Sequence, residues 1–205
     1  MSSLIADHAF LRLVWGNTAE VIPGRLYRSN HPTPRRLARL VRRFGIRTVV
    51  NLRGSERYTG SNVLSEAAAV RLGVAHAYIP FESRGAPQRD RILRFYDNYR
   101  GWAEPALVHC KSGADRAGLA AGLVILFEGG TAAQALAQLS LRYLHFRRSS
   151  TGILDAFFLR FQAEAEGNKP FLDWVREDYD EAALRQSFRA AGLSSFINDR
   201  VLARE

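Results

Sequence analysis

The chain has 205 residues, which is enough for one domain or for one domain with an elaborated end. Its apolar fraction of 47% and charged fraction of 24% are ordinary for a soluble globular protein. The single cysteine, Cys110, excludes an intramolecular disulfide and a four-cysteine zinc site. The net charge of +9 favours anionic partners, but it does not choose among phosphoesters, nucleic acid and an anionic membrane surface.

The first part of the chain predicts strands that alternate with helices. Residues 1–22 lack a sustained period and are interpreted as a lead-in to the turn at Pro23-Gly24. Thr33-Pro34 is typical of a helix start, and Gly45 of a helix end. Strands are expected at 25–29, 46–52, 75–81 and 105–109, and helices at 34–44, 61–72, 88–99 and up to 127.

The second part of the chain predicts helices only, at 131–139, 150–166, 170–177 and 180–191. This order indicates an α/β fold with a central, mostly parallel sheet of four to five strands flanked by helices, with extra C-terminal helices. We expect a single domain over residues 1–205, with an α/β part at about 23–165 and a helical extension at about 166–205. The aromatic residues of the extension (Phe171, Trp174, Tyr179 and Phe188) are expected to face the core.

The longest apolar run, Ala117 to Phe127, contains two glycines and is shorter than the ~20 residues of a membrane-spanning helix. We therefore expect a core helix there. Asp7, His8 and Arg12 interrupt the N-terminal segment, which argues against a secretory signal. These features predict a soluble, cytoplasmic protein.

The segment around Cys110 carries the chemistry. Val108 is expected to end a strand and Gly118 to begin a helix, so residues 110–116 would wrap a helix N-terminus. Unpaired backbone N–H groups and the helix dipole favour an anion there, and they also favour the thiolate form of Cys110. Gly113 lets the backbone approach that anion, and Arg116 offers a planar fork that matches two phosphate oxygens.

The pattern His109-Cys110-x5-Arg116 resembles the signature of the protein tyrosine and dual-specificity phosphatase superfamily. Residues 26–29 and 48–53 also resemble segments of small bacterial dual-specificity-like members, so the likeness covers roughly 23–128. The resemblance implies a phosphotyrosine phosphatase-like fold and a phosphoric monoester hydrolase that works through a phosphocysteine, without metal or cofactor. It implies catalytic roles for Cys110 and Arg116, a loop-orienting role for His109, and phosphate binding by Lys111, Ser112, Gly113, Ala114, Asp115 and Arg116.

Two carboxylates are candidates for the general acid. The loop Cys110-x-x-Gly113-x-Asp115-Arg116 resembles that of the myotubularin lipid phosphatases, whose loop aspartate has been assigned this role. Asp115 could instead cap the helix, and Glu82 could be the acid or a surface carboxylate. Ala117 departs from the serine or threonine that is usual in the superfamily. This departure could lower the rate at which the phosphocysteine is hydrolysed.

Arg53, Arg84 and Glu82 are candidate substrate-binding residues, and Arg28 is a candidate either to bind a second anionic group or to have a structural role.

The substrate could be a phosphotyrosine protein, a small molecule or an anionic phospholipid such as phosphatidylglycerophosphate, with peripheral contact to an anionic membrane. The alternative is a non-catalytic phosphate-binding module. We expect no nucleic-acid binding, because no such motif is present. The sequence does not indicate an oligomeric state.

His145 lies in a basic segment with Arg142, Arg147 and Arg148. Its spacing from the other histidines does not indicate a metal site, and the segment could face the substrate or only solvent.

Overall fold

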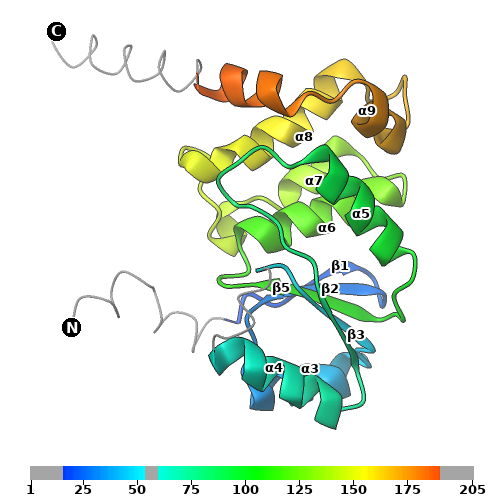
Figure 1. The fold of residues 1–205 in the computed structure, drawn as a ribbon, viewed down its shortest axis with the longest axis vertical. Coiled ribbons are helices and arrows are strands. Elements are labelled where there is room, and N and C mark those ends of the chain that lie inside the picture. Colours follow the sequence, from blue (N-terminus) through cyan, green and yellow to red (C-terminus); the bar gives the residue numbers. More distant parts are fainter. Residues whose placement is uncertain (1–15, 54–59, 190–205) are drawn as a thin grey trace, which may run out of the picture.

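A sheet runs through the middle of the molecule, with helices on both sides (Figure 1). The structure is a computed structural model that describes residues 16–53 and 60–189. Within these residues the sheet has five strands in the order β1-β2-β5-β3-β4, of which only β1 is antiparallel to its neighbour. The strands are β1 (Ala19–Ile22), β2 (Leu26–Asn30), β3 (Thr48–Asn51), β4 (Ala75–Tyr78) and β5 (Ala106–Cys110). The predicted fold class is confirmed.

Side chains of the central strands alternate between two cores. Val50 of β3 and Val108 of β5 belong to the larger core, whereas Val49 and Leu107 belong to the smaller core on the opposite face. This alternation follows from the two-residue period of a strand. Because both faces are covered, the central strands β3 and β5 are buried along their whole length and carry adjacent apolar residues, which made them recognisable.

Helices α3 (Pro34–Phe44) and α4 (Gly60–Arg71) cover one face of the sheet (Figure 1). As predicted, α3 is capped by Thr33, whose side chain accepts a hydrogen bond from the Arg36 backbone, and it ends at Gly45. The other face carries α5 (Arg89–Tyr99), α6 (Asp115–Phe127), α7 (Ala132–Ala137), α8 (Ile153–Glu164) and α9 (Phe171–Glu177). Two short 3-10 turns, Leu141–Tyr143 and Ser150–Gly152, join α7 to α8.

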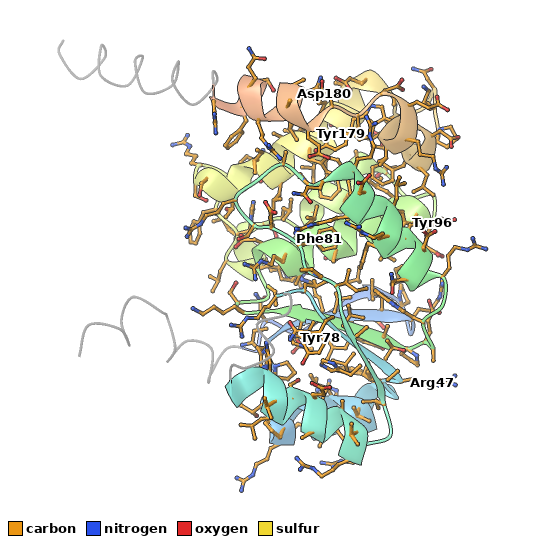
Figure 2. All side chains as sticks on the ribbon, in the orientation of Figure 1. Arg47, Tyr78, Phe81, Tyr96, Tyr179 and Asp180 are labelled. Carbon is orange, nitrogen blue, oxygen red and sulfur yellow. The ribbon has the colours of Figure 1, made fainter. Side chains whose placement is uncertain are left out.

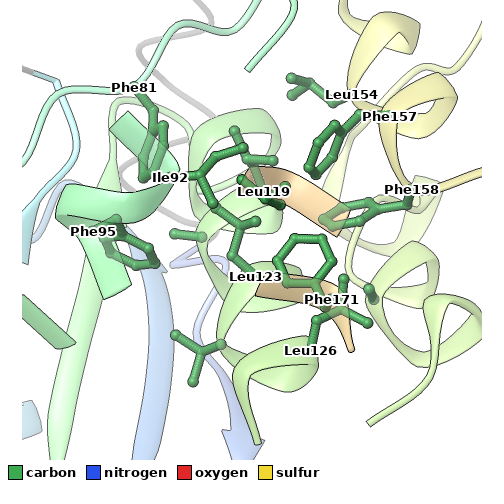
Figure 3. Packing of buried hydrophobic residues seen from close by; sticks show 14 of the residues in the cluster. Phe81, Ile92, Phe95, Leu119, Leu123, Leu126, Leu154, Phe157, Phe158 and Phe171 are labelled. Atoms are coloured by element: carbon green, nitrogen blue, oxygen red, sulfur yellow. The ribbon is translucent and has the colours of Figure 1, made fainter. Parts of the chain in front are cut away.

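The larger core lies around α6. Figure 3 shows Leu119 and Leu123 of this helix between α5 and the aromatic side chains of α8 and α9. Nine residues of α6 are buried, including Ala117 and Gly118 at its start. The first turn of α6 is therefore fixed by packing on several helices at once.

The C-terminal helices are part of this core. Trp174 and Tyr179 are fully buried, and the Tyr179 hydroxyl donates a hydrogen bond to the Pro87 carbonyl at 2.7 Å. Figure 2 shows Tyr179 and Asp180 at the end of the molecule that lies away from Tyr78 and the sheet. The chain is helical again from 181 to 189. The expected core-facing aromatic stripe is confirmed, with Phe188 partly buried against the core.

Several predicted elements are wrong in detail. β1 occupies part of the expected lead-in, because a four-residue edge strand depends on pairing with β2 more than on its own pattern. The strand predicted over 75–81 ends at Tyr78, and the helix expected from Gly118 begins at Asp115. The predicted helix at 150–166 starts with a 3-10 turn. The lead-in over 1–15, with Asp7, His8 and Arg12, and the helix end at 191 lie outside the described residues.

No helix among the described residues combines the length and the apolarity that a membrane crossing requires.

Candidate active site

Cys110 ends β5 and the phosphate loop, residues 110–116, leads from it into α6. The thiol is buried, with only 3% of the residue exposed. Its Sγ accepts a hydrogen bond from the Gly113 backbone N–H at 3.2 Å. A backbone donor beside the sulfur and the N-terminal end of α6 suit an anion that is held in the loop.

Gly113 permits this loop to form. Its φ of +76° lies in the left-handed region. A Cβ at this position would lie 2.7 Å from the backbone nitrogen of Asn30 and 2.8 Å from the carbonyl carbon of Ser29. The loop therefore sits directly on the backbone of β2, and a side chain at residue 113 would push the two apart.

Arg28 supports the loop from below. It lies within β2, and its Nη2 donates hydrogen bonds to the carbonyls of Gly113 (2.6 Å) and Ala114 (3.0 Å). Its Nη1 donates to the backbone and side-chain oxygens of Gln138, and its guanidinium lies 3.8 Å from the centre of the Tyr143 ring. Burial lowers the pKa of Arg28 to about 10, which leaves it charged at neutral pH. Of the two roles considered for Arg28, these contacts match the structural one.

The loop forms the floor of a cavity of about 780 Å³. Five cationic side chains line it: Arg53, Arg84, Arg91, Lys111 and Arg116. The structure thus brings Cys110 together with the predicted loop residues Lys111, Ser112, Asp115 and Arg116 and with Arg53, Arg84 and Glu82. Arg91 is an addition that the sequence analysis missed. The Arg116 Nε is buried and has no hydrogen-bond partner within the described part of the chain.

The two candidate acids have different surroundings. Glu82 lies on the cavity wall, with its side chain 46% exposed, and pairs with Arg91 at 3.4 Å. Asp115 is the first residue of α6, and its Oδ1 lies 2.7 Å from Nδ1 of His145. No side chain caps α6 at its N-cap, Ala114.

His145 connects Asp115 to a second carboxylate. Its Nε2 lies 2.6 Å from Oδ2 of the buried Asp155, and Arg147 Nε donates a hydrogen bond to Asp155 Oδ1 at 2.9 Å. Burial by itself lowers the pKa of His145, but the hydrogen bonds to Asp115 and Asp155 outweigh burial and raise the pKa to about 9. We call Asp115, His145, Asp155 and Arg147 the His145 network.

The sequence analysis missed this network. A signal was present in α8, because Asp155 lies among Ile153, Leu154, Phe157 and Phe158 on a helix that packs into the core. A carboxylate in such a setting needs a cationic or hydrogen-bonding partner. The identity of that partner could not be predicted, because His145 and Arg147 meet Asp155 only in the folded chain.

His109 is fully buried below the loop, with its ring edge-on to His31 at 4.8 Å. Burial, followed by the nearby His31, His76 and Arg53, holds its pKa well below the usual value, so its ring is neutral. Its loop-orienting role remains a prediction.

No group of three or more His, Cys, Asp or Glu side chains in the described ranges, 16–53 and 60–189, is arranged to hold a metal ion.

The loop and its cavity correspond to a known family. The family model described as "PTP-SAK: Swiss Army Knife protein, DSP-PTPase phosphatase domain" matches residues 16–151. The chain belongs to this family. It is a cysteine phosphatase of the dual-specificity type, and hence a phosphoric monoester hydrolase. The resemblance predicted from His109, Cys110 and Arg116 is confirmed, and membership in this family argues against the non-catalytic alternative.

Solved structures share the fold of this PTP-SAK family member. P. aeruginosa TpbA is 21% identical and has a TM-score of 0.57, with 77% of this chain and 91% of that chain covered. The core catalytic domain of the PP-IP phosphatase SIW14 from S. cerevisiae, in complex with citrate, is 16% identical and has a TM-score of 0.56, with 74% and 92% covered. PTPMT1 is 19% identical and has a TM-score of 0.52, with 74% and 99% covered. No curated protein matches the sequence.

Proposed function

We propose that this phosphatase hydrolyses phosphomonoesters that carry at least one further anionic group. The observation that carries the proposal is the charge of the cavity, whose lining, among the residues that the structure describes, has five cationic side chains and two acidic ones. The loop with Arg116 accounts for one phosphate. Arg53 and Arg84, which lie on the cavity wall outside the loop, are placed to bind a second anionic group.

In the proposed reaction, the Cys110 thiolate attacks phosphorus while Arg116 and the loop amides stabilise the equatorial oxygens. The S–P bond forms as the P–O bond to the leaving group breaks, and Asp115 gives the leaving oxygen a proton. Water then attacks the phosphorus of the phosphocysteine and gives a proton to Asp115. The S–P bond breaks, which releases phosphate and restores the Cys110 thiolate. Asp115 is preferred to Glu82 because it lies within the loop that holds Cys110, whereas Glu82 lies on the cavity wall outside the loop.

The cavity wall favours an anionic head group or a small polyphosphate over phosphotyrosine. Phe81 is the only aromatic residue among those that line the described cavity, and it is buried against Phe95 at a ring distance of 5.1 Å. A phosphotyrosine ring would therefore meet mostly polar and charged side chains. The name of SIW14, a PP-IP phosphatase with the same fold, agrees with a polyanionic substrate.

A second candidate, a phosphatase that acts at an anionic membrane, is favoured by the segment beside the cavity. Leu141, Leu144 and Phe146 are exposed, and Arg142 and Arg148 are exposed between and after them. Apolar side chains interleaved with arginines suit the surface of an anionic bilayer. A phospholipid such as phosphatidylglycerophosphate would satisfy both candidates.

The proposal is tested with wild type and Cys110→Ser on five substrates: 4-nitrophenyl phosphate, a phosphotyrosine peptide, a phosphoserine peptide, an inositol polyphosphate and phosphatidylglycerophosphate in vesicles. We expect the highest kcat/KM on the last two, and a loss of roughly 10⁴-fold or more in Cys110→Ser. Equal activity on all five would contradict the polyanion proposal. Phosphate binding without release from any substrate would instead indicate the binding module.

The second anionic site is tested with Arg84→Gln. Loss of one charge-assisted contact should raise KM for the inositol polyphosphate about tenfold and leave KM for 4-nitrophenyl phosphate nearly unchanged. The control is Arg94→Gln, because Arg94 is exposed on α5 and does not line the cavity. An equal rise in KM for both substrates would place Arg84 at the reacting phosphate instead.

The acid is tested with Asp115→Asn and Glu82→Gln. Removal of a general acid costs about 100-fold or more when the leaving group is a poor one. We expect that loss in Asp115→Asn on an alkyl phosphate, with a much smaller loss on an aryl phosphate. The same pattern in Glu82→Gln, with Asp115→Asn unaffected, would transfer the role to Glu82.

A further inference from the structure

His145 is held by carboxylates on both ring nitrogens. The side chain is fully buried, with Oδ1 of Asp115 at 2.7 Å and Oδ2 of Asp155 at 2.6 Å. An ionised carboxylate can only accept hydrogen bonds, whereas a neutral imidazole has one donor and one acceptor. Both contacts are satisfied together when His145 carries two N–H groups, so the geometry calls for the imidazolium.

The charged and titratable groups around this imidazolium come from four elements. Asp115 is on α6, Asp155 is on α8, and Arg147 lies on the same segment as His145 and pairs with Asp155. Arg28 of β2 faces the segment through the Tyr143 ring. The charges of Asp155 and Arg147 offset each other, which leaves His145 and Asp115 as an ion pair at the edge of the cavity.

Asp155 is fixed independently of Asp115. It is 1% exposed, its Oδ2 faces His145, and its Oδ1 accepts from Arg147. Since α8 packs through Leu154, Phe157 and Phe158 into the core, the position of Asp155 is set by the fold. The imidazole ring therefore has a rigid anchor on the side away from the cavity.

Asp115 is the member that reaches the cavity. Its side chain is 25% exposed, and it lines the cavity together with Cys110. His145 occupies Oδ1, which leaves Oδ2 as the oxygen that a bound phosphoester can meet. One oxygen of the Asp115 carboxyl group is thus bound by His145, and the other is available for proton exchange.

We propose that His145 is a positioning residue for Asp115, which it orients for proton transfer and whose ionised form it stabilises. In the first step the proton on Oδ2 of Asp115 passes to the leaving oxygen as the P–O bond breaks, and the resulting carboxylate pairs with the His145 imidazolium. His145 keeps both of its protons. In the second step the carboxylate takes a proton from the attacking water, which restores Asp115. This inference rests on the proposed function and adds a residue to it.

The test compares His145→Gln, Asp115→Asn and the double variant on an alkyl phosphate and an aryl phosphate. We expect His145→Gln to lower kcat on the alkyl phosphate by about tenfold or more and on the aryl phosphate by less than about threefold, with KM nearly unchanged. In the double variant, loss of His145 should add nothing to the loss from Asp115→Asn. His76→Gln is the matched control, because His76 lies on β4 and does not line the cavity.

Asp155→Asn guards against a trivial loss of folding. It keeps the size of the side chain and removes the charge that pairs with His145 and Arg147, so it should reproduce the selective loss on the alkyl phosphate in a folded protein. Equal losses on both substrates in His145→Gln and Asp155→Asn, or additive losses in the double variant, would overturn the positioning role while the phosphatase proposal stands. Absence of Cys110-dependent turnover in the wild type would overturn both.

Discussion

The phosphate loop and the segment that supports it, residues 138–155, differ in how they are encoded. In the loop, seven consecutive residues supply the thiol, the backbone amides and the guanidinium. In the supporting segment, each of three residues contacts a residue that is distant in the sequence. Gln138 accepts hydrogen bonds from Arg28, the Tyr143 ring packs against the Arg28 guanidinium, and His145 pairs with Asp115. The groups of the loop therefore come from one stretch of sequence, whereas the contacts that hold Arg28 and Asp115 are long-range ones.

The largest expected effect on stability comes from replacement of Arg28, which connects the loop to the supporting segment. Arg28→Met deletes four hydrogen bonds from a buried guanidinium to Gly113, Ala114 and Gln138. Because the acceptors remain buried, we expect a loss of about 4 kcal/mol in the free energy of unfolding, measured by urea denaturation. Arg42→Met, on the exposed side of α3, is the control. A loss below about 1 kcal/mol would mean that the loop does not depend on Arg28.

A second variant acts on the loop alone. Gly113→Ala introduces a Cβ at a φ of +76° and within 3 Å of the backbone of β2. Strain and overpacking together should cost about 3 kcal/mol and displace the loop enough to lower kcat. Gly129→Ala has the same sign of φ but open space around the new Cβ, so it should cost about 1 kcal/mol and leave kcat unchanged. Equal costs for the two variants would show that the contact with β2 is unimportant.

The third prediction concerns pH and the supporting segment. The pKa of His145 is raised from 6.5 to about 9 by Asp115 and Asp155. Protonated His145 therefore stabilises the fold fully below pH 6.5, and this stabilisation is lost as pH rises through about 9. We expect the free energy of unfolding to fall by about 3 kcal/mol between pH 6 and pH 9.5 in the wild type, beyond any change in His145→Gln. Parallel curves for the two proteins would refute this assignment.

The smallest effect should come from Asn17, which bridges the two regions. Its Nδ2 donates to the carbonyls of Ser112 in the loop and Tyr143 in the supporting segment, both at 3.0 Å. Asn17→Gly removes these bonds without adding backbone strain, since the φ of Asn17 is +46°. We expect a loss of about 1.5 kcal/mol in thermal or urea unfolding. A larger loss in Asn17→Ala than in Asn17→Gly would confirm that backbone strain is separate from hydrogen bonding.

These differences explain what the sequence could predict. Cys110, Gly113 and Arg116 were recognisable because their function depends on neighbours in the chain and on a strand-to-helix change that hydrophobic patterns mark. The contacts of Asn17 and His145 were not, because their partners lie 95 and 30 positions away. For Arg28 the sequence left a structural role and a substrate-binding role open, because its partner Gly113 lies 85 positions away. β1 was missed for the same reason, since its pairing partner and not its four residues makes it a strand.

The position of Asp155 has a consequence for how the protein can be divided. The family match ends at residue 151, four residues before Asp155, although α8 carries that aspartate into the core. A fragment cut at the family boundary would keep the whole phosphate loop and His145 but lose the anchor of His145 and the aromatic side chains that cover α6. We therefore expect the smallest fragment of this phosphatase that folds by itself to extend beyond the shared family segment, at least through the end of α8 at Glu164.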